Sequence, residues 1–402
     1  MENMLKLRPY APLISLCACA LWSGSEQVAC GAATFQNDSI THVPTIVAGD
    51  PGGVPPDSAA NRVDPNVASS PWAGVGSLFI GFPGGSAICT GVAISERYVL
   101  TAGHCIDRND NGVYDGSTEV WQLTFNVNRT GTTEGYAAHH GRSIIHPDYT
   151  GFNNPTVNDD LALVELRDDL PAHVPIYPLY RGELSGGETL DLVGYGISGD
   201  GVGGYSVGFS YTTKRWGQNV ADILDVDDEG SGSNELFYYD FDGPAGNGPW
   251  GGPTLGNDVE TLVGGGDSGG PAFINDNGTW KVAGVNTFSG SLGPPPQGQF
   301  GEVGGGILLN PYLDWIDGIA GTAPVSGAYV PEPQTALLLL LGLGAFTMMR
   351  RGDVREEVLR NLARYIQPPD FTTDPVARKL AATPTTHEGS RSRTRVRRLY
   401  RK

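Results

Sequence analysis

The chain is poor in cysteine, in basic residues and in long apolar runs. Only five of its 402 residues are cysteine, and Cys17, Cys19 and Cys30 lie near the N-terminus. Lys and Arg number 26 against 44 Asp and Glu, which argues against a nucleic-acid partner. The apolar run 336–349 is shorter than the roughly 18–20 residues that a membrane-spanning helix needs.

Glycine is abundant, and one glycine-rich turn carries the strongest functional signal. Residues 266–271 read Gly-Asp-Ser-Gly-Gly-Pro. A serine on such a turn exposes its hydroxyl, and the backbone N–H groups of Gly266 and Ser268 can point at one spot beside it. A nucleophile next to two such donors is the arrangement that acyl transfer requires. Ser268 is therefore the candidate nucleophile, and Gly266 and Ser268 form the candidate oxyanion hole.

Two further stretches complete a resemblance to the trypsin-like, chymotrypsin-fold serine proteases. Residues 101–105 read Thr-Ala-Gly-His-Cys, and residues 158–164 read Asn-Asp-Asp-Leu-Ala-Leu-Val. In that family the histidine is the general base and the aspartate orients it, which implies His104 and Asp160. Asp159 competes for the second role, but Asp160 directly precedes the apolar run. The order His, Asp, Ser is that of this family and differs from the order in subtilisin and in α/β-hydrolases.

The resemblance implies an exported serine endopeptidase that works through a Ser-His-Asp triad and an acyl-enzyme intermediate. His104 would take the proton of Ser268 and later deliver it to the leaving group, while Asp160 holds the imidazole tautomer. No cofactor is required, and the partner is a protein or peptide substrate. The alternative is a non-catalytic surface or matrix-binding protein that retains the protease fold. The presence of all three triad residues favours the enzyme.

The implied fold class is all-β: two six-stranded Greek-key β-barrels with the active site between them, and a short C-terminal helix. Short β-branched and aromatic runs, broken by Gly, Pro, Asn and Asp, agree with this class. Residues 310–320 are expected to form the helix. Residues 198–256, rich in Gly and Asp, are interpreted as surface loops. Strands are expected at 75–80, 92–100, 120–127, 190–195 and 280–288.

The N-terminal region is typical of an exported precursor. Residues 1–33 are predicted to be a signal peptide, with basic residues before the apolar run 11–22. Residues 34–62 are interpreted as a pro-region or linker, and residues 63–321 as the trypsin-like domain. In the family a new amino terminus pairs with the aspartate before the nucleophile, here Asp267. Either Ile46 or Val63 begins that terminus.

The C-terminal region resembles a PEP-CTERM sorting signal of Gram-negative bacteria. Residues 330–333 read Val-Pro-Glu-Pro and precede the apolar run and a basic pair, within a segment 322–351. The resemblance implies an exosortase-type processing enzyme as partner, transient membrane association, and a final place at the cell surface or outside the cell. An ordinary C-terminal anchor is the alternative. Residues 352–402 are predicted to be a basic, disordered tail.

The resemblance also implies one disulfide and a substrate pocket. Cys89 and Cys105 have the family's spacing for the bridge beside the catalytic histidine. Leu262, six residues before the nucleophile, takes the pocket-floor position, and leucine there cannot select Lys or Arg. An apolar or small P1 residue is therefore expected. The pocket wall is assigned to Thr287, Phe288, Ser289 and Gly304.

A candidate structural calcium loop follows His104. Residues 107–115 place oxygen-bearing side chains at alternate positions around a glycine, as in an EF-hand loop. The twelfth position is Thr118 rather than Glu, so the match is partial and a polar turn is the alternative. The candidate ligands are Asp107, Asn109, Asn111 and Asp115.

Overall fold

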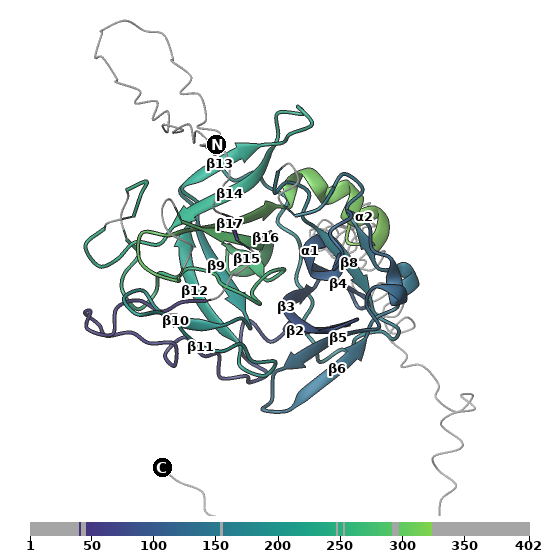
Figure 1. The fold of residues 1–402 in the computed structure, drawn as a ribbon, viewed down its shortest axis with the longest axis horizontal. Helices are drawn as coiled ribbons and strands as arrows, with labels where there is room; N and C mark the ends of the chain where they lie inside the picture. Colours follow the sequence, from purple (N-terminus) through teal and green to yellow (C-terminus); the bar gives the residue numbers. More distant parts are fainter. Residues whose placement is uncertain are drawn as a thin grey trace, which may run out of the picture. The chain divides into compact units, whose positions relative to one another are not determined.

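The computed structural model describes residues 40–41, 46–152, 156–246, 248–251, 254–291 and 297–323. These residues form two large antiparallel sheets and few helices (Figure 1). The all-β class with a short C-terminal helix is thereby confirmed. The predicted signal peptide, sorting signal and basic tail lie outside the described residues. Among the described residues, no helix has the length and apolar character needed to cross a membrane.

The first sheet has seven strands in the order β6-β5-β2-β3-β4-β8-β7. The predicted single strand 92–100 is wrong, because it contains a turn. The Ser95 hydroxyl accepts the backbone amides of Arg97 and Tyr98, and this local bonding reverses the chain between β3 and β4. The strands are β2 (Val75–Phe82), β3 (Gly85–Ala93), β4 (Tyr98–Thr101), β5 (Gln122–Asn128), β6 (Thr133–Ala137), β7 (Ile144–Ile145) and β8 (Ala162–Glu165).

The second sheet has eight strands, in the order β12-β9-β15-β16-β17-β14-β13 with β1 on the edge of β16. Its strands are β1 (Ile40–Thr41), β9 (Thr189–Gly194), β12 (Arg215–Val220), β13 (Ile223–Val226), β14 (Asn234–Asp240), β15 (Pro271–Asp276), β16 (Thr279–Gly290) and β17 (Val303–Leu308). A separate hairpin joins β10 (Ser198–Asp200) to β11 (Gly204–Val207). The interpretation of 198–256 as loops is therefore wrong, since five strands lie there.

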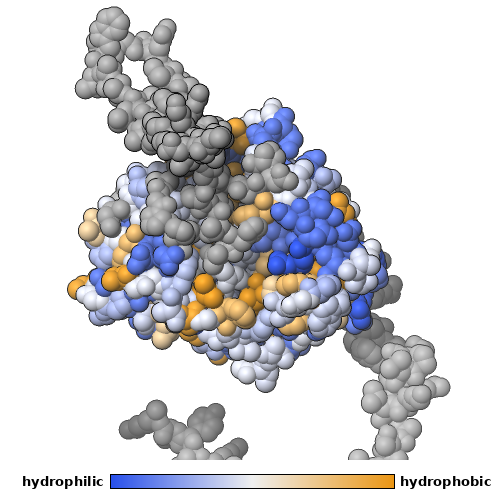
Figure 2. Space-filling model, in the orientation of Figure 1, coloured by the Kyte–Doolittle hydropathy of each residue, from blue (hydrophilic) through white to orange (hydrophobic). Residues whose placement is uncertain are grey.

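Apolar side chains of the strands form the core. Val75, Leu78 and Ile80 are fully buried, and they lie in one core with residues of the second sheet. Trp72 stacks on Phe273 of β15, with ring centroids 5.1 Å apart, and so ties the approach to β2 to the second sheet. Polar residues dominate the described surface on the face shown in Figure 2, with hydrophobic residues scattered among them.

The helices are short and lie at the ends of strands. α1 (Gly103–Ile106) follows β4, and η1 (Gly116–Thr118) and η2 (His140–Arg142) are single 3₁₀ turns. The predicted helix 310–320 is η3 (Asn310–Tyr312) continued by α2 (Leu313–Ala320), which buries Ile316. It ends at Gly321, whose φ of 67° is the left-handed conformation that glycine adopts without strain.

Candidate active site

His104 and Asp160 come from neighbouring strands of the first sheet. His104 lies in α1, directly after β4, and Asp160 lies two residues before β8. The Oδ2 atom of Asp160 is 2.6 Å from Nδ1 of His104, and its Oδ1 accepts the backbone amide of His104 at 2.8 Å. Both side chains are buried, Asp160 completely. One carboxylate therefore fixes the ring and the backbone of the histidine together.

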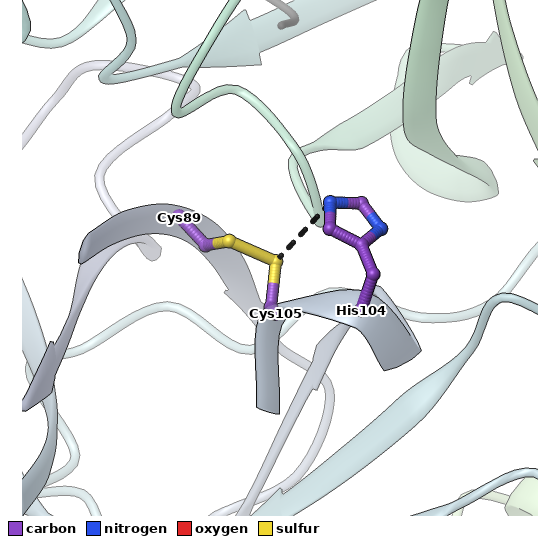
Figure 3. A group of neighbouring side chains, drawn as sticks. All are labelled: Cys89, His104 and Cys105. Carbon is purple, nitrogen blue, oxygen red and sulfur yellow. Dashed lines mark hydrogen bonds between the residues drawn. A yellow bond between two sulfur atoms is a disulfide. The ribbon is translucent and has the colours of Figure 1, made fainter. Parts of the chain in front are cut away.

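A disulfide and an aromatic ring border the same imidazole. Cys89 of β3 and Cys105 of α1 form the disulfide, with Cα atoms 6.2 Å apart. Figure 3 shows that the Cys105 sulfur faces the His104 ring, and it lies 4.0 Å from Nε2. Phe152 meets the ring edge-on at 4.9 Å between centroids. Sequence reasoning missed Phe152, since no motif includes it.

The adjacent Asp159 points elsewhere. Its φ of 59° turns it away from the direction of Asp160. Its Oδ1 accepts the hydroxyl of Tyr312 at 3.1 Å and lies 3.1 Å from Nδ1 of His146. Of the two neighbouring aspartates, Asp160 is thus the one that contacts His104.

Ser268 lies on the turn before β15, and the first sheet holds that turn. The Thr90 hydroxyl of β3 donates to the carbonyl oxygen of Gly266 at 2.8 Å, and the Thr90 amide donates to that of Ser268 at 2.8 Å. Gly269 has a φ of 79°, and a Cβ there would lie 1.9 Å from Oγ1 of Thr101. Only glycine fits that position, so the turn and the strand that leads to His104 are in direct contact.

The backbone amides of this turn divide into two groups. Those of Asp267, Gly269 and Gly270 donate to protein carbonyls at 3.0, 2.8 and 2.7 Å. Within the described ranges, the amides of Gly266 and Ser268 donate to no protein acceptor. Gly266 has a φ of 105°, which only glycine adopts readily. The two predicted oxyanion donors are therefore the two amides of the turn that remain available to a ligand.

Asp267 is buried beside Ile46. The carboxylate of Asp267 accepts the backbone amides of Gly196, at 2.8 Å, and of Ile46. Burial raises its pKa to about 7, while those two amides and the charge of Arg215 act in the lowering direction. Ile46 is itself 1% exposed, and the Ser198 hydroxyl donates to its carbonyl oxygen at 2.7 Å.

The other candidate start, Val63, lies in a different environment. Val63 is 36% exposed. The preceding Arg62 is buried, forms an ion pair with Asp57 at 2.6 Å, and donates to the carbonyl oxygens of Val259 and Glu260. Arg62 therefore has a structural role. Cleavage before Val63 would break a peptide bond next to this buried side chain.

The predicted pocket residues lie on two neighbouring strands and one buried loop. Thr287, Phe288 and Ser289 belong to β16, and Ser289 pairs with Gly304 of β17. Leu262 is fully buried, and its carbonyl oxygen accepts the amide of Val47.

Tyr239 of β14 also lies beside the predicted pocket, and sequence reasoning missed it. Its ring is fully buried, and a Cβ on Gly304 would lie 2.4 Å from its hydroxyl. Tyr239 therefore fills the space beside that glycine.

The candidate calcium loop is bonded through its own atoms. The two carboxylate oxygens of Asp107 accept the amides of Asn111 and Gly112, at 3.2 and 2.8 Å. The Asp115 carboxylate accepts the side-chain amides of Asn109 and Asn111. Sequence reasoning missed Glu119, one residue beyond the twelfth position of the loop. Its carboxylate accepts the backbone amides of Arg108, Asn109 and Asp115.

Two family models match the chain. Residues 62–215 match the model named Trypsin, and residues 330–355 match the PEP-CTERM protein-sorting motif. Among curated proteins, Melanization protease 1 of Drosophila melanogaster is 27% identical over 254 residues, which is 57% of each chain. An uncharacterized peptidase of Corynebacterium glutamicum is 27% identical over 269 residues, 62% of this chain and 75% of its own. Serine protease ea of Drosophila is 29% identical over 264 residues.

The chain spans 57% and 58% of the length of the two Drosophila relatives. Among solved structures, HL collagenase is 18% identical, with a TM-score of 0.43 over 62% of this chain and 94% of its own. Mouse neuropsin is 16% identical, with a TM-score of 0.40 over 62% and 95%.

Proposed function

Because the chain carries a domain of the trypsin family and a PEP-CTERM sorting motif, we propose that it is an exported serine endopeptidase. The observation that carries the proposal is the double contact of Asp160 with His104, 2.6 Å to the ring and 2.8 Å to the backbone. A buried carboxylate on Nδ1 fixes the tautomer that leaves Nε2 as the basic atom, and it stabilises the imidazolium once formed.

Ser268 is the nucleophile in this proposal. His104 removes the proton from Oγ as that oxygen attacks the substrate carbonyl carbon, and the tetrahedral intermediate forms. His104 then returns the proton to the leaving amine, which gives the acyl-enzyme, and water repeats the two steps. The reaction uses side chains and backbone amides alone and requires no cofactor.

The oxyanion is stabilised by the amides of Gly266 and Ser268. Their lack of protein acceptors in the described chain supports this role, because the amides of Asp267, Gly269 and Gly270 in the same turn are already bonded. Thr90 holds the turn by two hydrogen bonds of 2.8 Å, so the donors need no rearrangement when charge develops.

Maturation is proposed to occur by cleavage between Thr45 and Ile46. The Ile46 amide already contacts the Asp267 carboxylate, so cleavage would place an α-ammonium group against a buried acid. Val63 has no such partner, and Arg62 beside it is engaged in the fold. The segment before Ile46 includes β1, whose Thr41 pairs with Ser289 on the edge of β16. Its removal would free that edge beside the proposed pocket.

The proposed pocket favours small or apolar P1 residues. Leu262 offers no charge at its floor, and the Tyr239 hydroxyl lies against Gly304 in its wall region. A buried cationic side chain would lack a partner there, which costs several kcal/mol. We therefore expect p-nitroanilides with Ala, Leu or Phe at P1 to give a higher kcat/KM than those with Arg or Lys. Faster cleavage after Arg would contradict this assignment.

Export is proposed to follow the PEP-CTERM route. The match of residues 330–355 to the sorting motif supports recognition by an exosortase-type enzyme. It also supports placement at the cell surface or outside the cell. The basic residues after the apolar run would stay cytoplasmic until processing, by the positive-inside bias. The carboxylates of Asp107 and Asp115 in the candidate calcium loop already accept amides of the same loop, and none of these steps needs an ion there.

Labelling with a fluorophosphonate probe tests the catalytic proposal. The mature protein should be labelled, Ser268→Ala should not be, and Ser185→Ala, at an exposed serine outside the site, should be labelled as the parent is. His104→Ala should lose labelling in step with peptide hydrolysis, because the triad acts as a unit. A mature protein that is folded but unlabelled would point to the non-catalytic binding function instead.

A further inference from the structure

Four carboxylates converge directly behind the loop that carries Asp160. Asp159 precedes Asp160, Asp228 and Glu229 lie between β13 and β14, and Glu235 lies in β14. One oxygen of each lies within 4.8 Å of an oxygen of every other. Oxygens that ligate one ion at about 2.4 Å are at most about 4.8 Å apart, so the four satisfy the geometric condition for sharing a divalent cation.

Among the described residues, the only basic side chain paired with this cluster is His146, which lies 3.1 Å from Asp159. Within the described ranges, no Lys or Arg forms an ion pair with any of the four carboxylates. Burial raises the pKa of Glu235 to about 7, and the charge of Asp159 adds to the increase. Like charges held this close require a cation or protons.

A buried histidine beside the cluster lacks a hydrogen bond at one ring nitrogen. His146 is 9% exposed, and its ring is held edge-on by Tyr312 and Trp315 at 4.8 and 4.9 Å between centroids. Its Nδ1 lies 3.1 Å from Oδ1 of Asp159, yet it makes no hydrogen bond to any described residue. The ring nitrogen thus faces the Asp159 carboxylate at ion-pair distance without hydrogen-bond geometry, so this side of the cluster remains incompletely satisfied.

The surroundings allow an ion to enter and be held. Asp228 and Glu229 are exposed, whereas Asp159 and Glu235 are buried, so the cluster opens to solvent on one side. The Asn158 side chain donates to Glu235 at 2.9 Å, and the Thr156 hydroxyl donates to Asp228 at 2.6 Å. These bonds orient two of the carboxylates and leave other oxygens for a ligand.

We propose that Asp159, Asp228, Glu229 and Glu235 bind one divalent cation, and that Ca²⁺ is the preferred ion because all four ligands are carboxylates. The ion would join the Asp160 loop of the first sheet to β14 of the second sheet. It would also hold the backbone turn in which the Leu161 amide donates to the Asp159 carbonyl at 2.6 Å. The site is distinct from the loop at Asp107, and its existence does not depend on peptidase activity.

Titration of the full chain in a Ser268→Ala background, which prevents self-digestion, tests the proposal. After chelator treatment, calorimetry with CaCl₂ should show one ion per chain with a submillimolar Kd. Tb³⁺ should bind competitively, with luminescence excited through Tyr312 and Trp315. Glu235→Gln should weaken Ca²⁺ binding at least tenfold, and so should the exposed pair Asp228→Asn and Glu229→Gln, which is not expected to disturb folding.

A matched variant in the other acidic loop separates the two candidate sites. Asp115→Asn, at an exposed position, should leave Ca²⁺ affinity and Tb³⁺ luminescence unchanged. In chelator, Glu235→Gln should raise Tm by removing repulsion, and it should abolish the rise in Tm that Ca²⁺ gives the parent. The proposal is overturned if the parent binds no ion, or if Asp115→Asn loses binding while the cluster variants retain it. His146 and Asp159 would then form only an ion pair.

Discussion

The side chains of His104 and Asp267 differ in the partners that they have in the intact chain. Around His104, one oxygen of Asp160 contacts the imidazole, the other accepts the backbone amide, and a disulfide borders the ring. Around Asp267, by contrast, the carboxylate is buried with backbone amides as its hydrogen-bond partners, and its pKa is raised to about 7. The contacts of His104 are thus made before cleavage, whereas Asp267 forms no ion pair among the described residues and only the charge of Arg215 acts on it.

The difference indicates where control of the proposed enzyme lies. Asp160 already contacts the ring and the backbone of His104 in the intact chain, so the proposed base and the proposed orienting acid do not depend on processing. A buried carboxyl that contacts the Ile46 amide changes its partner when that amide becomes an α-ammonium group. Each prediction below alters one member of this comparison, beginning with the largest effect.

Asp160→Asn should cause the largest loss of activity, because it removes the carboxylate that contacts the ring and the backbone of His104. The amide side chain can keep the contact with the His104 backbone but stabilises the wrong tautomer and no imidazolium. We expect kcat on a peptide substrate to fall by about 10⁴-fold, as in triads where this change has been measured. Asp169→Asn, at an exposed aspartate, is the control. A loss of less than tenfold in a variant with unchanged Tm would contradict the role of Asp160.

The sequence predicted the local parts of this site and missed the parts that depend on long-range pairing. His104, Asp160 and the Cys89–Cys105 bridge belong to short motifs, so their neighbours along the chain identify them. Phe152 and Tyr239 carry no motif and reach the site only through the packing of distant segments. The acidic cluster likewise joins segments 77 residues apart, as the bond from Asn158 to Glu235 illustrates.

Two errors in the predicted fold have local physical causes. Residues 92–100 read as one apolar strand, but the Ser95 hydroxyl satisfies two backbone amides and favours a turn. Residues 198–256 read as loops because Gly and Asp are frequent, although several of these residues lie within short strands. The seven- and eight-stranded sheets follow partly from these additional strands, where six strands each were predicted.

The stability of the precursor should fall as the pH rises, because of Asp267. Its pKa is raised from 3.8 in the unfolded chain to about 7 in the fold, so the folded state keeps a proton that the unfolded state releases. Stability is therefore lost between about pH 4 and pH 7, by about 4 kcal/mol at most. Asp267→Asn in the uncut chain should reduce the fall in Tm from pH 5 to pH 8.

The mature form supplies the second half of this test. Glu235 and Asp191 also have raised pKa values, so part of the pH dependence is common to all variants. In the form that begins at Ile46, the α-ammonium group should lower the pKa of Asp267 and remove its share. Calorimetric scans at both pH values measure the difference between precursor and mature protein. Equal pH dependence in the two forms would show that Ile46 does not pair with Asp267 after cleavage.

Removal of the disulfide should have the smallest effect of the three, and it tests whether covalent closure is what completes the His104 region. The bond closes a loop of 16 residues, which is worth about 3 kcal/mol through the entropy of the unfolded chain. The double variant Cys89→Ala with Cys105→Ala avoids a free thiol and should lower Tm by about 6–12 °C. Dithiothreitol should lower the Tm of the parent toward this value and leave that of the variant unchanged. Because Asp160 bonds the ring and the backbone of His104 independently of the sulfur atoms, kcat below the new Tm should fall by less than tenfold. A larger loss of kcat would mean that the disulfide, and not the carboxylate alone, positions the imidazole.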